Sequence, residues 1–318
     1  MVQQTELATE SVGQPRSERL LGDAASQSRS KLRSTPGFYS RAWRRLRRDK
    51  VAMVALVICI SVVLFAVCAP IISEITGHSY ETGDLRANLV APGEQGYVLG
   101  TDANGRDILT RLAYGGRISL MVAWLSALVA LAVGGTVGSI AGYYGGFIDS
   151  ALMRFVDVII AIPGITLLLL LSTLWRPGPV GLALVIAALG WTGIARLVRG
   201  EVLSLKSRDY VDAARVIGAT NSRIIYRHIF PNVLSLVIVW ISLAIPGLII
   251  AEASLSYLGF GVRIPIPSWG NMLDEAKEFY RSSWTYVFLP GLAIYITALG
   301  FNLLGNGLRD ALDPRLND

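Results

Sequence analysis

The chain has 318 residues, 53% of them hydrophobic and 16% charged, with a net charge of +6 and a mean hydropathy of +0.50. That hydropathy is high for a soluble domain, and the length of the apolar runs argues against a large soluble protein. Residues 51–72 carry no charge. A helix of that length spans about 33 Å, which is enough to cross the hydrocarbon core of a bilayer.

The first 50 residues divide into a polar tail and a basic segment. Residues 1–37 are rich in Ser, Gln and Arg and contain no aromatic residue, which predicts a disordered tail. Residues 38–50 include the stretch SRAWRRLRRDK, and we expect a helix on the membrane surface with Trp43 in the interface. The remaining residues, 51–318, are expected to form the membrane domain.

Five further apolar runs follow the first one. Lipid offers the backbone no hydrogen-bond partner, so each span is expected to be a helix. The sequence therefore predicts an all-α integral membrane protein with six transmembrane helices. Besides 51–72, the expected spans lie near 118–143, 151–174, 180–199, 233–258 and 284–306.

Two kinds of small-residue pattern occur inside the spans. Glycines recur every four residues in GGTVGSIAGYYGG, which predicts one helix face that packs closely on a neighbour; they are Gly134, Gly138, Gly142 and Gly146. Three spans contain a Pro-Gly pair, which removes a helical hydrogen bond and loosens the next position. These pairs can be static kinks or hinges in helices that rock; they begin at Pro163, Pro246 and Pro290.

Charged residues inside the spans are few. Asp157 lies three residues after Arg154, and we expect a local ion pair between them. Glu252 lies deeper, and an intramembrane carboxylate is a candidate for a transport pathway. The neighbouring polar residues that could line such a cavity with it are Ser254, Ser256 and Tyr257. A satisfied hydrogen bond between helices is an equally good interpretation of Glu252.

The stretch YVDAARVIGATNSRIIYRHIFPN, residues 210–232, interrupts the apolar runs. Its first part predicts a short helix with one slim face formed by Val211, Ala214 and Gly218, kept narrow by Ala213. Such a helix suits a groove on another protein. Asp212 and Arg215 flank the face, Asn221 is expected to cap a second helix, and Pro231 is expected to end it before the next span. An ordinary loop helix beneath a bundle remains the alternative.

The distribution of Lys and Arg predicts the orientation. Of 29 such residues, 21 fall on one side in this arrangement, in residues 1–50, 145–154, 196–228 and the C-terminal tail. The positive-inside rule then places both termini and the loop 200–232 in the cytoplasm. The basic balance is thus a feature of topology, and no folded basic face points to nucleic acid.

The sequence contains no recognisable nucleotide-binding, catalytic or metal-binding motif. A phosphate-binding P-loop needs Gly-Lys followed by Ser or Thr, and none of the four lysines follows a glycine. No Ser-His-Asp, Cys-His or paired-carboxylate arrangement stands out, and the two histidines, His78 and His228, are expected on opposite sides of the membrane. We therefore expect neither an enzyme nor a metal site, and no cofactor bound by this chain.

The loop around residue 212 carries a resemblance to a known family. DAARVIG followed by RHIFPN resembles the EAA loop of binding-protein-dependent ABC importer permeases, with Asp212 in place of Glu, His228 in place of Ile and Phe230 in place of Leu. Further segments are similar to the C-type permease subunit of dipeptide and oligopeptide importers. They are AWRRLRRDKVAMVAL, GTDANGRDILTRLAYGGRISLMV, LSYLGFGVRIPIPSWGNML and GLRDALDPRL.

The resemblance implies a type I importer, MetI-like fold and a place in the bacterial cytoplasmic membrane. The subunit would form half of a peptide pore with a homologous B-type permease. Two ATPase subunits would bind ATP and Mg²⁺ below, and an extracytoplasmic binding protein would deliver the peptide. The residues implied in ATPase coupling are Tyr210, Val211, Asp212, Ala213, Ala214, Arg215, Gly218, His228 and Pro231. The same architecture carrying nickel complexes or another small solute remains an alternative, as does a secondary transporter.

Overall fold

The computed structural model describes residues 38–175 and 177–312. The expected tail, residues 1–37, lies outside the described residues. Helices account for nearly all regular structure within those ranges, and no β-strand occurs there beyond an isolated bridge between Thr101 and Asp107. The all-α prediction is confirmed for this part of the chain.

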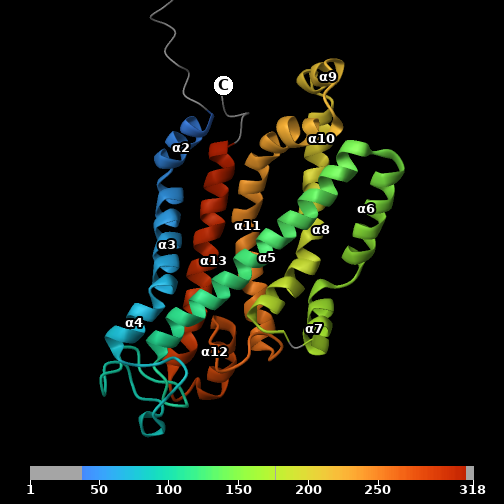
Figure 1. Cartoon of the computed structure of the whole chain (residues 1–318). Helices are drawn as coiled ribbons and strands as arrows, with labels where there is room; N and C mark the ends of the chain where they lie inside the picture. Colours follow the sequence, from blue (N-terminus) through green and yellow to red (C-terminus); the bar gives the residue numbers. More distant parts are fainter. Residues whose placement is uncertain (1–37, 176, 313–318) are drawn as a thin grey trace, which may run out of the picture.

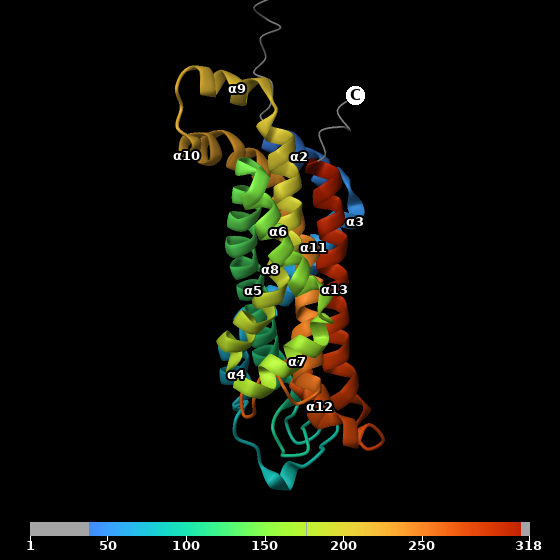
Figure 2. The ribbon, with the colours of Figure 1, turned by 90° about the vertical axis from the view of Figure 1, so that its right-hand side faces the viewer.

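Long helices run side by side between two ends of the molecule (Figure 1). One end carries α2, α9 and α10, and the other carries α4, α12 and the loop that joins α4 to α5 (Figures 1 and 2). We call these the α9 end and the α12 end. The α-helices are α2 (Phe38–Arg48), α3 (Lys50–Val67), α4 (Ala69–Thr76), α5 (Ile108–Tyr144), α6 (Gly146–Ala161), α7 (Gly164–Trp175), α8 (Pro179–Lys206), α9 (Asp209–Val216), α10 (Asn221–Arg223), α11 (Phe230–Tyr257), α12 (Trp269–Ala276) and α13 (Trp284–Leu312). The shorter turns are η1 (Leu85–Ala87), the π-helical η2 (Ile224–Ile229) and η3 (Lys277–Phe279).

Four of the six expected spans lie within single helices. The first, 51–72, continues past the end of α3 at Val67 into α4, and the third is broken. The helices long and apolar enough to cross a membrane are α3, α5, α8, the continuous stretch Asn221–Tyr257, and α13. The expected span 151–174 was wrong as one helix, because α6 and α7 meet at an angle of 83°. If the bent pair forms one broken span, the described residues contain six candidate spans; without it they contain five.

Pro163 explains the break, whereas the other two prolines do not break their helices. Ile162, the residue before it, has φ −86° and ψ 131°, the extended conformation that proline imposes on its predecessor. Pro246 and Pro290 lie inside the continuous helices α11 and α13. Of the three Pro-Gly pairs, only the first therefore marks a sharp change of direction.

The glycine stripe brings α5 and α8 into close contact. A Cβ atom at Gly134 would clash with the carbonyl oxygen of Trp191, and one at Gly138 with that of Ala195. At Gly142 the nearest atom would be the carbonyl oxygen of Arg199, at 2.9 Å. The packing role of these three glycines is confirmed. The prediction was wrong for Gly146, which lies beyond the end of α5 with φ +56° and no atom within 4 Å of a Cβ.

Helix α2 forms where the basic interfacial helix was expected. Its Ala42 and Leu46 are buried, and α2 contacts α13 through this side. Trp43 is exposed, and the Arg47 guanidinium lies 5.2 Å from the centre of its ring. The arrangement is that of a helix with one face on the bundle and a basic, aromatic face outward.

Candidate functional site

Helix α9 stands apart from the bundle at its own end of the molecule (Figure 2). Asp209 and Asp212 occupy its first turn, where carboxylates interact favourably with the helix dipole. The helix ends in a Schellman motif, since the amide of Ala219 donates to the carbonyl oxygen of Ala214 and the amide of Gly218 to that of Arg215. Gly218 has φ +78°, which a residue with a side chain adopts only at a cost.

The slim face of α9 packs against the rest of this chain. Val211 and Ala214 are buried and pack in a cluster with Tyr143, Val202 and Ile224. The prediction that this face enters a groove on another protein was therefore wrong. Gly218 does not share the face, because the helix ends before it and a Cβ there would meet no atom within 4 Å.

The outward face of α9 is also apolar. Val216 and Ile217 are 87% and 84% exposed, and Tyr210 and Ala213 lie on the same exposed side. The ion pair between Asp212 and Arg215, 2.8 Å long, is exposed beside them. A sequence has no means of separating the two apolar faces of so short a helix, and only packing on η2 and α8 shows which one remains free.

The second half of the loop also departs from expectation. Thr220, not Asn221, caps α10, with its hydroxyl accepting from the amide of Arg223. The side chain of Asn221 instead accepts a hydrogen bond from the Tyr143 hydroxyl at 2.7 Å. Pro231 does not end a helix, because it lies in the first turn of α11, where its missing N–H is harmless. The backbone carbonyl of His228 accepts from Asn232.

Glu252 is fully buried between helices. One carboxylate oxygen accepts from Ser119 of α5 and the other from Ser256 of α11, each at 2.7 Å. The Ser119 oxygen also accepts from the amide of Trp269, at the start of α12. Of the two sequence interpretations, the hydrogen bond between helices is the one seen for Glu252, through Ser119 of α5, while Ser256 bonds Glu252 within α11. For the partly exposed Ser254 and Tyr257 a pathway role stays a prediction.

A buried charge cluster at the α12 end escaped the sequence analysis. Arg111 of α5 is fully buried and pairs with Asp102 and with Glu275, whose oxygen lies 2.6 Å from its Nη1. Arg106 bonds both carboxylates as well, at 2.6 and 2.8 Å, and Tyr286 of α13 donates to Glu275 at 3.2 Å. The charges of the two arginines and two acids balance. In the sequence, these four charged residues only stand out as lying between the expected spans. They are separated by up to 173 positions, so nothing there indicated that they meet.

Two ion pairs join α6 to α8. Asp157 pairs with Arg196 at 2.5 Å, so the expected pair with Arg154 was wrong. One to two turns nearer the α9 end, Asp149 accepts two hydrogen bonds from Arg199, at 2.5 and 2.6 Å. The antiparallel course of the two helices brings these partners together, which a local i,i+3 rule does not consider. Among the described residues no group of three or more His, Cys, Asp or Glu side chains could hold a metal.

Comparison with known proteins agrees with this architecture. Residues 134–318 match the family described as binding-protein-dependent transport system inner membrane component. The chain belongs to this family. Residues 37–92 also match the N-terminal transmembrane domain of oligopeptide transport permease C, so the C-type resemblance of the sequence is confirmed.

Several relatives of this permease are known by function. It is 42% identical to the oligopeptide transport system permease protein OppC of Haemophilus influenzae over 86% of this chain and 88% of that protein. It is 40% identical to the dipeptide transport system permease protein DppC of Bacillus subtilis, over 86% and 85% of the two chains. The glutathione transport system permease protein GsiD of Pectobacterium atrosepticum is 39% identical, over 86% and 90%.

A solved structure shares the fold. A chain of the MetNI methionine ABC transporter, in inward-facing conformations, aligns with a TM-score of 0.52 and 18% identity, over 64% of this chain and 96% of that one. The expected MetI-like fold of a multi-pass membrane permease is thereby confirmed.

Proposed function

We propose that this chain forms half of the translocation pore of an ATP-driven peptide importer and couples to a separate ATPase through α9. The relatives named above transport oligopeptides, dipeptides and glutathione, which supports a peptide as the solute. Its partners would be a B-type permease, two ATPase subunits that bind ATP and Mg²⁺, and an extracytoplasmic binding protein. The membrane would be the bacterial cytoplasmic membrane, with α9 on the cytoplasmic side.

The outward face of α9 carries this proposal. Val216 and Ile217 lie together on a helix that projects beyond the bundle, with most of their side chains exposed. Burying one such side chain stabilises a contact by roughly 1.5–3 kcal/mol. A groove on an ATPase would cover this face, while the buried Val211 and Ala214 fix the helix to the permease. Movement of the ATPase would then pass to η2 and α8, on which α9 packs.

The test is capture of the ATPase by the assembled membrane subunits. Ile217→Asp and Val216→Asp should leave insertion intact but abolish co-purification of the ATPase and ATP-driven uptake in vesicles. Leu85→Asp is the matched control, because Leu85 is 77% exposed at the opposite end. Wild-type capture by both α9 variants would remove α9 as the coupling element. Gly218→Asp is a poorer probe, because its positive φ adds backbone strain.

The orientation has its own test. A reporter inserted beside Gly93, in the loop of the α12 end, should be extracytoplasmic, whereas one fused to the C-terminus should be cytoplasmic. Finding both on the same side would contradict the arrangement predicted from the Lys and Arg count.

A further inference from the structure

Helix α2 presents four arginines and a tryptophan on the side that faces away from the bundle. Its other side is fixed, because Leu46 packs with Ala52 of α3 and Ala311 of α13. With about 3.6 residues per turn, the exposed residues fall roughly on the half of the helix opposite Leu46 and the buried Ala42. We call this side the arginine face; it consists of Arg41, Trp43, Arg44, Arg47 and Arg48.

The arginine face has an excess of positive charge. Among the described residues, none of its four arginines is in an ion pair. Asp49, the nearest acid in the sequence, accepts from two backbone amides, at 2.9 and 3.2 Å, as the N-cap of α3. In the last turn of α13, which contacts α2, the exposed Asp310 is offset by the exposed Arg309. The charge of the face is therefore open to an anionic partner.

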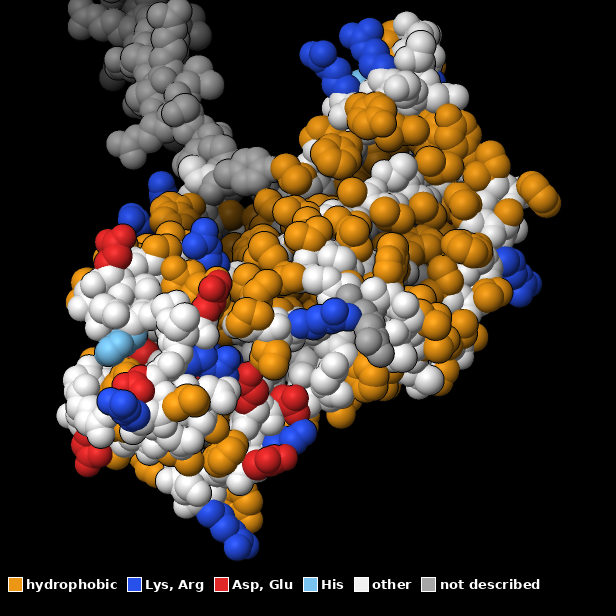
Figure 3. Space-filling view, turned by 60° about the horizontal axis from the view of Figure 1, so that its bottom comes forward, with side chains coloured by type: hydrophobic (Ala, Val, Ile, Leu, Met, Phe, Trp, Pro, Cys, Tyr) orange, Lys and Arg blue, Asp and Glu red, His pale blue; other side chains and the backbone are white. Residues whose placement is uncertain are grey.

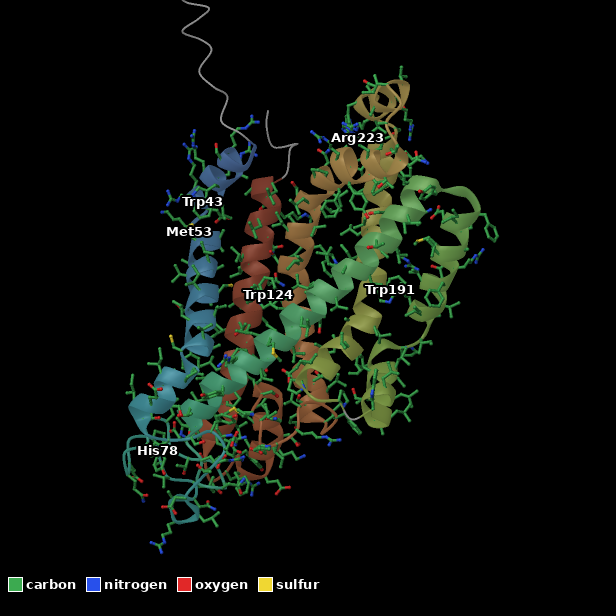
Figure 4. The ribbon with its side chains drawn as sticks, viewed as in Figure 1. Trp43, Met53, His78, Trp124, Trp191 and Arg223 are labelled. Atoms are coloured by element: carbon green, nitrogen blue, oxygen red, sulfur yellow. The ribbon has the colours of Figure 1, made fainter. Side chains whose placement is uncertain are left out.

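The place of α2 beside α3 puts it at the level of the lipid headgroups. Helix α3 is the one span candidate within residues 37–92, the segment that matches an N-terminal transmembrane domain. Its 18 residues are about 27 Å long, close to the hydrocarbon thickness of about 30 Å, and its exposed side chains from Val51 on are apolar except for Ser61. Only Asp49 separates α2 from α3, so α2 begins where the hydrocarbon ends. Figure 4 shows Trp43 at the outer edge of the bundle, on the α9 side of Met53 in the first turn of α3.

A protein partner is the other occupant to weigh, because α9 lies at the same end. The two helices differ in position and chemistry. Helix α9 projects beyond the bundle and its free side chains, Val216 and Ile217, are apolar, whereas α2 lies against the ends of α3 and α13 (Figures 1 and 2). Arginines that adjoin a membrane span, with a tryptophan beside them, are typical of contact with anionic lipid.

We propose that the arginine face of α2 binds the headgroups of anionic phospholipids in the leaflet at the α9 end. A guanidinium donates two parallel hydrogen bonds to a phosphate group, and packing on the reverse side of α2 holds four of them ready. A zwitterionic lipid carries a phosphate as well, but its own cation offsets the attraction, so the face selects a headgroup with net negative charge. An interfacial helix as such needs only an apolar side; the four arginines add the selectivity. This inference does not depend on the solute that the permease carries.

Photolabelling by lipid tests the selectivity. The full-length chain, in its membrane complex, is placed in nanodiscs of phosphatidylcholine that contain a trace of photoreactive phosphatidylglycerol or photoreactive phosphatidylcholine. Labelling of residues 38–54, mapped by mass spectrometry, should be about fivefold greater from phosphatidylglycerol, the selectivity that corresponds to ~1 kcal/mol for a basic residue near an anionic surface. Salt at about 1 M should reduce the difference, because it screens charges beyond about 3 Å. Equal labelling by the two lipids would overturn the proposal.

A triple variant tests whether the arginines cause the selectivity. The changes Arg41→Gln, Arg44→Gln and Arg48→Gln should lower the labelling by phosphatidylglycerol to the level of phosphatidylcholine. The matched control changes three exposed arginines in the loops of the α12 end, Arg86→Gln, Arg263→Gln and Arg281→Gln, and should leave the labelling of residues 38–54 unchanged. Wild-type labelling of the α2 variant, or an equal loss in the control, would overturn the proposal.

Capture of the ATPase separates a lipid from a protein partner. It is measured for the wild type and for the α2 triple variant in nanodiscs of phosphatidylcholine alone, where no anionic lipid can contribute. Equal capture is expected, because the arginine face would then have no part in binding the ATPase. A loss of capture in the α2 variant would assign the face to a protein partner and overturn the proposal.

Discussion

The two ends of the molecule use their charged residues in opposite ways. At the α12 end, Asp102, Arg111 and Glu275 form a buried cluster that ties a loop, α5 and α12 together. At the α9 end, the pair between Asp212 and Arg215 is exposed and lies within one short helix. Figure 3, which brings the α12 end forward, shows the charged side chains gathered over that end and apolar ones over the sides.

The difference indicates which end is complete without a partner. Charges taken out of water are costly unless paired, so the α12 cluster holds its elements in one arrangement. The exposed pair of α9 imposes no such constraint, and the apolar side chains beside it, Val216 and Ile217, are left largely uncovered by the part of the chain that the structure describes. We therefore expect substitutions at the α12 end to lower the stability of the fold. Substitutions at the α9 end should instead weaken the binding of partner subunits.

The largest effect should come from Arg111→Leu, which removes the central cation of the cluster. Two carboxylates would then share the remaining Arg106 in a buried place, at a cost of about 3–5 kcal/mol. The measurement is the thermal unfolding midpoint of the detergent-solubilised complex. Arg215→Leu at the α9 end is the control and should cost about 1 kcal/mol or less. Similar costs at the two positions would abolish the contrast between the ends.

A second prediction concerns the link between the ends, the contact of α5 with α8. Gly138→Val should force these helices apart, because a Cβ there would clash with the Ala195 carbonyl. Overpacking of this kind typically costs about 1–3 kcal/mol. Gly135→Val on the same helix is the control, since only Leu131 approaches its Cβ, at 3.7 Å. Unfolding curves in detergent should separate the two variants; coinciding curves would show that the glycine stripe does not set the helix distance.

A third prediction concerns Glu252, which helps to fix α12 to the bundle through Ser119. Glu252→Leu would leave the hydroxyls of Ser119 and Ser256 without their acceptor, at a cost of about 1–3 kcal/mol. Glu252→Gln keeps an acceptor and the shape, and should cost less. Limited proteolysis near Trp269 would report release of α12. If the Leu variant resists protease as the wild type does, these bonds do not hold α12.

The smallest effect is expected at the end of α9. Gly218→Ala places a side chain at φ +78°, which costs roughly 1–2 kcal/mol, and the strain should be confined to the loop. In this variant the backbone amides of residues 218 and 219 should exchange hydrogen faster, while the thermal unfolding midpoint of the whole protein stays nearly constant. Gly193→Ala, at an open helical position of α8, is the control and should not raise exchange. A drop in the global midpoint for Gly218→Ala would show that α9 supports the bundle.

The sequence by itself determined the apolar spans and the family, although not the break between α6 and α7. Uncharged runs long enough to cross a bilayer fix the spans because lipid cannot satisfy the backbone, and this holds whatever the neighbours are. The four-residue period of Gly134, Gly138 and Gly142 likewise identifies a contact face from one helix alone. The distribution of Lys and Arg predicts the orientation, and the loop motif around Asp212 indicates the family. Neither depends on which residues are in contact, so both could be interpreted without coordinates.

Only the tertiary structure decided which residues meet across helices. Asp157 had a possible partner three positions away, but the antiparallel course of α6 and α8 brings Arg196 to it. Arg111 meets Glu275 from 164 positions away, a distance over which no periodicity operates. In α9 both faces are apolar, so periodicity alone cannot choose between them. Val211 packs in a cluster with residues of α8 and η2 and is buried, while Ile217 stays exposed.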